Sequence, residues 1–183
     1  VMIVITVSFS ISFCFNAQEI MMFLYNDYSH SMTEVVVLLM IGFNAIGVIY
    51  IVGTLLTANG NLLQMNFVFS IGIIINISSN YFMILSFGAW GAAICTIITQ
   101  AFVALAELEL VRRHFKIEIK YWYIGRIILF GLGVCAINYG VEQIEIFWFI
   151  RFVLAGICCL IWAFLSKMLQ IQRVLSMFRP ITT

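Results

Sequence analysis

Two residues of opposite charge, Glu19 and Arg151, lie inside long apolar segments. An ionised carboxylate in such surroundings must be protonated, paired or in contact with water. We expect both residues near the same outer end of their helices, so Arg151 is a candidate partner for Glu19. Glu19 has three possible roles: snorkelling to the membrane interface, a structural ion pair, or coupling and substrate contact. Arg151 could contact a phosphate group, because guanidinium presents a fixed fork of donors.

Three asparagines form a second group of polar side chains within apolar sequence: Asn44, Asn76 and Asn80. Asn76 and Asn80 are four residues apart, which places them on one face of a helix. An amide without a partner in hydrocarbon costs several kcal/mol. We therefore expect these side chains either to form hydrogen bonds between helices or to line a polar cavity.

The elements that must position these residues are six apolar segments, each of roughly the length that crosses a bilayer as a helix. Their approximate ranges are 1–24, 35–56, 63–85, 89–110, 122–139 and 147–165. The connections between them are short. The sequence thus predicts an all-α polytopic membrane helical bundle, with residues 1–183 forming a single transmembrane domain.

Composition supports this fold class. The chain is 64% hydrophobic and 9% charged, whereas soluble domains carry about 25% charged residues. Its net charge of +1 gives no case for nucleic acid as a partner. Membrane lipids are the expected surroundings.

Charge also predicts the orientation, because basic residues favour the cytoplasmic side of a membrane. The bases concentrate after the fourth segment and near the carboxyl end: Arg112, Arg113, Lys116, Lys120, Arg126, Lys167, Arg173 and Arg179. With six spans, these positions share one side, so we expect a cytoplasmic C-terminus. The first apolar segment begins at Val1, so we expect an N-terminal part of the protein to be missing.

No motif in the chain predicts covalent chemistry. The five cysteines lie in apolar segments without the spacing or histidine support of a metal site, so we expect no metal, no cofactor and no catalytic residue. Glu107, Glu109, Arg112 and Arg113 follow the fourth segment, and we interpret them as solvated charges at the interface, with Glu109 and Arg113 paired at i,i+4 spacing.

Three sequence motifs occur in order in the middle of the chain. They are Leu55-Leu-Thr-Ala-Asn-Gly-Asn61, the asparagine pair within Gly72–Asn80, and Phe87-Gly-Ala-Trp-Gly-Ala-Ala93. Together with Glu19-Ile-Met-Met-Phe-Leu-Tyr25, they resemble the C-terminal half of polysaccharide transporters, the O-antigen (Wzx-type) flippases of the multidrug/oligosaccharidyl-lipid/polysaccharide exporter superfamily. Two positions depart from that pattern: Leu85-Ser86 lacks the usual proline, and Asn61 stands where lysine is common.

The resemblance implies the C-terminal lobe of a two-lobed carrier in the bacterial cytoplasmic membrane, whose partner is the missing N-terminal lobe. Its substrate would be an undecaprenyl-pyrophosphate-linked oligosaccharide for surface polysaccharide synthesis, moved by alternating access. Glu19, Asn44, Asn76, Asn80 and Arg151 are then the candidate substrate or cavity residues. One alternative is a drug or cation antiporter of the same superfamily. A membrane-embedded glycosyl or acyl transferase is a further alternative, for which Glu142 and Glu145 offer two carboxylates in an outer loop.

Overall fold

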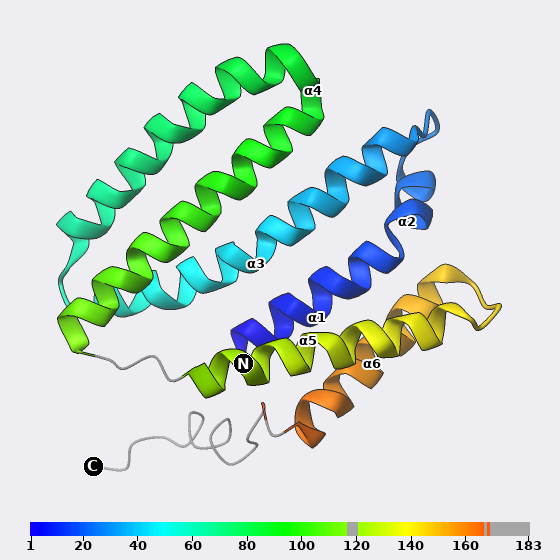
Figure 1. Ribbon diagram of the computed structural model, residues 1–183. Coiled ribbons are helices and arrows are strands. Elements are labelled where there is room, and N and C mark those ends of the chain that lie inside the picture. The colour runs from blue at the N-terminus through cyan, green and yellow to red at the C-terminus, as the bar shows by residue number, and fades with distance from the viewer. Residues whose placement is uncertain (117–120, 167, 169–183) are drawn as a thin grey trace.

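The computed structural model describes residues 1–116, 121–166 and 168 and shows six helices with no strand in that part of the chain. Their bounds are α1 Met2–Phe15, α2 Ala17–Leu24, α3 His30–Ala58, α4 Leu62–Phe115, α5 Tyr121–Glu142 and α6 Trp148–Leu165 (Figure 1). Helix is the form in which apolar segments satisfy their backbone polar groups without water. The predicted all-α architecture is confirmed.

Four of the described helices are long and apolar enough to cross a membrane: α3, α4, α5 and α6. The number rises to five if α1 and α2, which meet at a 72° bend, form one broken span. Large apolar side chains on these helices are widely exposed, for example Leu63, Leu85 and Leu165. Lipid is the solvent that suits such surfaces, so the structure supports a membrane protein.

The helix boundaries differ from the predicted segments at two breaks. The first predicted span, 1–24, is divided at Asn16 into α1 and α2. The third and fourth, 63–85 and 89–110, belong to one element, α4, which is interrupted at Gly88 with φ 57° and ψ −135°. A positive φ is accessible to glycine because it has no Cβ. Figure 1 shows that the chain reverses direction here, so the two arms of α4 lie side by side.

Smaller differences lie at the helix ends. α3 starts five residues before the predicted 35 and runs to Ala58, where the turn at Asn59 and Gly60 ends it, with Gly60 at φ 79°. α4 extends through Arg112 and Arg113 to Phe115, past the predicted end at 110. The basic residues Lys120, Lys167, Arg173 and Arg179, used to predict the orientation, lie outside the described residues.

α1 occupies the middle of the bundle, in contact with α3 on one side and with α5 and α6 on the other (Figure 1). Close approach to α3 requires Gly47, where a Cβ would lie 2.8 Å from Cγ2 of Thr6. The core among α1, α5 and α6 consists of Val4, Phe130, Val134, Cys159 and Ala163. A separate core joins α3 to α4 through Val52, Leu56 and Val111.

Candidate functional site

The bend between α1 and α2 is centred on Asn16, whose side chain is 3% exposed. Its Nδ2 donates to the carbonyl of Ser12 at 2.8 Å. Its Oδ1 accepts a hydrogen bond from Nε of Arg151 on α6 at 3.3 Å. A short polar side chain that bonds to nearby backbone is suited to such a helix break. Asn16 thus ties the bend to α6.

Arg151 also forms an ion pair with Glu19, through Nη2 and Oε1. This confirms the prediction that Arg151 is the partner of Glu19. The Arg151 side chain is 15% exposed and that of Glu19 is 38% exposed, so Arg151 does not snorkel into water. Because the bend restarts the helix at Ala17, Glu19 lies in the first turn of α2, where a helix dipole favours negative charge.

α5 brings a second buried amide to the same region. Asn138 is 3% exposed, and its Nδ2 donates to the carbonyl of Val134 at 2.9 Å and contacts Sγ of Cys159 at 3.8 Å. Asn16, Asn138, Glu142 and Arg151 line one small space between α1, α5 and α6. We call Asn16, Glu19, Asn138 and Arg151 the outer polar cluster.

Two members of this cluster, Asn16 and Asn138, were not among the predicted site residues. The signal that identified Asn44 and Asn76, an amide within an apolar segment, applies equally to both. Their shared location could not be read from the sequence, because 122 positions separate them.

Asn44 joins α3 to α1. Its Nδ2 donates to Oγ of Ser10 at 3.0 Å, and Ser10 in turn donates to the carbonyl of Met40 at 2.6 Å. Further contacts of Nδ2 are with the carbonyls of Met40 and Ile41. These bonds fit the predicted role of an interhelical contact, and they place Asn44 with α1 rather than with the other two asparagines.

Asn76 and Asn80 connect the two arms of α4. Nδ2 of Asn80 donates to Oδ1 of Asn76 at 2.9 Å, and Nδ2 of Asn76 contacts Oγ1 of Thr99, on the second arm, at 3.3 Å. Asn76, Thr96, Thr99 and Gln100 also line an open groove of about 510 Å³ along this face. Asn76 therefore bridges the two arms and also lines this groove, whose other lining residues include Phe69, Ile73 and Val103.

The interpretation of Glu107 as a solvated interfacial charge is wrong, because this residue is 0% exposed. Neither carboxylate oxygen has a hydrogen-bond partner among the described residues. Glu109 has the environment predicted for the group, with Nε of Arg112 and of Arg113 each 2.8 Å from its oxygens at the surface. The spacing along α4 indicates this burial. Glu107 follows Val103 by four residues and so shares its face of the helix, and Val103 packs against the other arm of α4 at Gly72.

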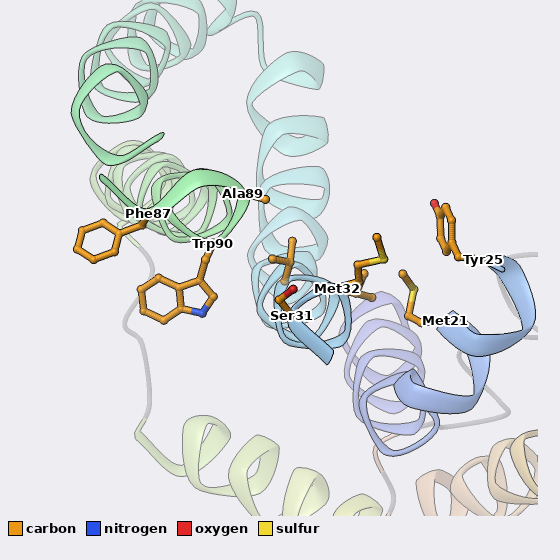
Figure 2. Close-up of a pocket in the computed structure, with 9 residues that line it drawn as sticks. Met21, Tyr25, Ser31, Met32, Phe87, Ala89 and Trp90 are labelled. Carbon is orange, nitrogen blue, oxygen red and sulfur yellow. The ribbon is translucent and has the colours of Figure 1, made fainter. Parts of the chain in front are cut away.

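A further cavity, of about 560 Å³, lies at the start of α3, beside α2. Figure 2 shows Phe87, Ala89 and Trp90 on the bend of α4, Ser31 and Met32 at the start of α3, and Met21 and Tyr25 on α2. Its lining is mainly apolar. It suits a hydrocarbon chain better than a polar reactant.

The described part of the chain has no group of three or more histidine, cysteine or acidic side chains that could hold a metal ion. The cysteines in that part are free thiols. His30 lies 3.3 Å from Glu34, and both side chains are exposed.

No protein-family model, curated protein or solved structure matches this chain.

Proposed function

We propose that this chain is the C-terminal lobe of a flippase that moves undecaprenyl-pyrophosphate-linked oligosaccharide across the bacterial cytoplasmic membrane. The proposal combines the motif resemblance with the outer polar cluster, and the contact between Arg151, Glu19 and Asn16 carries it. A cation stabilises a pyrophosphate inside an apolar bundle, and the guanidinium of Arg151 is held there by two polar partners.

In this proposal, Glu19 is the resting partner of Arg151 and yields to the pyrophosphate of the substrate. An anion of higher charge competes for the same guanidinium, and bidentate contact adds to its advantage. The bend at Asn16 supports this role, since transporters place binding groups at broken helices near the ends of half-helices. The apolar cavity at the α4 bend offers a surface for the polyprenyl chain.

The proposal assigns one membrane crossing to each arm of α4, since each exceeds the about 20 residues that a span requires. Together with α1–α2, α3, α5 and α6, this makes six crossings and a cytoplasmic C-terminus. Alternating access would then come from this lobe rocking against the N-terminal lobe, with the sugar passing between them.

The test is transfer of a labelled lipid-linked oligosaccharide in everted vesicles that contain the complete transporter. Arg151→Gln should abolish transfer, and Arg151→Lys should retain part of it because the charge remains but the fork is lost. Arg113→Gln is the matched control, because Arg113 is an exposed arginine that pairs with a carboxylate at the opposite end of the bundle. Full transfer by Arg151→Gln at wild-type protein levels would refute the proposal.

A drug or cation antiporter of the same superfamily is the second candidate, favoured by the carboxylate of Glu107, which is buried and has no partner among the described residues. Such transporters need acidic groups for ion coupling. Uptake of a fluorescent cationic drug driven by a pH gradient, without transfer of lipid-linked sugar, would select this candidate.

A further inference from the structure

Glu107 occupies the contact between α3 and the two arms of α4. Its two oxygens lie 3.6 Å and 3.7 Å from the position that a Cβ would have at Gly53 on α3, and Sδ of Met65 lies 3.7 Å from that same position. The side chain is fully buried. These distances are those of ordinary van der Waals contact, so the carboxyl group of Glu107 packs directly against α3 at Gly53.

This environment tolerates a carboxylic acid much better than a carboxylate. A buried neutral polar group without a partner costs about 1–3 kcal/mol. An isolated buried charge costs far more, so it either pairs or loses its charge. Glu107 lacks a described partner for either oxygen, so its ionisation requires water or a cation to reach it.

The charged and titratable groups on the surrounding elements leave Glu107 unpaired. On α3, His30 and Glu34 pair with each other at least 19 residues from Gly53, about 28 Å along a helix, and Tyr50 is 64% exposed. The first arm of α4 carries the titratable side chain of Tyr81, which is 68% exposed. The second arm carries Cys95, which is buried, then Glu109, Arg112 and Arg113, which pair with one another at the surface, and His114, which is exposed.

Water is nevertheless close to this site. Thr57 is exposed, lies one helical turn after Gly53 on α3, and its Oγ1 contacts Sδ of Met65 at 3.7 Å. A small separation of α3 from α4 at this end would connect Glu107 to the surface.

We propose that Glu107 is a proton-binding site whose ionisation opens the end of the α3–α4 contact. In the closed arrangement the carboxyl group holds its proton. When α3 and α4 separate, the proton passes to water, and the carboxylate is hydrated. Proton binding and helix packing are thereby linked, because each favours the same state.

Infrared spectroscopy of the purified protein tests the protonation state directly. The wild type at neutral pH should show the carbonyl stretch of a buried carboxylic acid, and this band should be lost in Glu107→Gln. Glu109→Gln is the matched control, two residues away on the same helix but exposed and paired, and it should retain the band. A wild-type spectrum at neutral pH without a band that Glu107→Gln removes would overturn the proposal.

Cysteine accessibility tests the link to packing. Met65→Cys, in a background with the five native cysteines replaced by alanine, places a thiol at the contact with Gly53. Its rate of modification by a water-soluble maleimide is compared with and without the additional change Glu107→Gln. Dividing the two rates removes the intrinsic effect of pH on the thiol. The rate with Glu107 present, divided by the rate with Glu107→Gln, should rise with pH if ionisation opens the contact. A ratio that stays constant with pH would overturn that link even if the infrared band is present.

Discussion

Glu19 and Glu107 are both glutamates in apolar helices, near opposite ends of α3, yet their surroundings differ. Glu19 is 38% exposed and paired with Arg151, whereas Glu107 is 0% exposed and unpaired among the described residues. The first arrangement is an ion pair that joins α2 to α6. The second favours an uncharged acid. Burial and pairing, rather than residue type, decide what a carboxyl group in a membrane bundle can do.

Among the variants that test this comparison, Arg151→Leu should lower the free energy of unfolding the most, because it leaves Glu19 without its cation. Breaking a fully buried pair costs about 3–5 kcal/mol, and partial exposure of Glu19 reduces the expected loss to about 2 kcal/mol. The free energy of unfolding in detergent micelles measures it. The double variant Glu19→Gln/Arg151→Leu should recover part of the loss, and absence of any recovery would show that the pair does not stabilise the fold.

Asn16→Ala should have the next largest effect, a loss of about 1–2 kcal/mol, because the carbonyl of Ser12 and Nε of Arg151 each lose a partner. The same unfolding experiment measures it. Asn44→Ala offers a comparison with an amide that lies outside the cluster and bonds to Ser10. If Asn16→Ala proves no more costly than an exposed substitution, Asn16 does not hold the bend to α6.

Glu107→Leu should act in the opposite direction and raise the free energy of unfolding by about 1 kcal/mol, because it removes a buried polar group without a partner. Glu19→Leu should lower it, since Arg151 then loses its carboxylate. The sign of these two changes, measured side by side, is the sharpest test of the comparison. A loss of stability in Glu107→Leu would show that the carboxyl group has a partner.

Glu109→Gln should give the smallest effect, with no measurable change in thermal unfolding at physiological salt. Its ion pairs with Arg112 and Arg113 lie at the surface, where water and salt screen them. A marked loss would mean that this charge group contributes to packing and that exposure is a poor guide to the value of an ion pair here.

Local sequence sufficed for most of the helices, because the length and hydropathy of an apolar segment depend only on neighbouring residues. The two positions where the prediction failed have a common cause. The bend at Asn16 contacts Arg151 on α6, and the buried carboxyl group of Glu107 packs against α3 at Gly53. In both contacts the partner lies far away in the sequence.

For the candidate site, charge balance in apolar sequence was enough to nominate Glu19 and Arg151 as partners. The same approach missed Asn16 and Asn138, which contribute to the outer polar cluster from α1 and α5. It also grouped Asn44 with Asn76 and Asn80, although Asn44 bonds to α1. Residue type identified polar groups that need partners, but helix rotation determines which partners they meet.

The sequence by itself determined that this chain is helical and suited to lipid, because hydropathy and segment length are properties of the chain alone. Tertiary structure decided the environment of each polar group: an ion pair for Glu19, a bridge between two arms for Asn76, and an enclosed space for Glu107. The physical reason is that the cost of a polar group in an apolar bundle depends on what lies within a few ångströms of it, and packing brings those neighbours from distant segments.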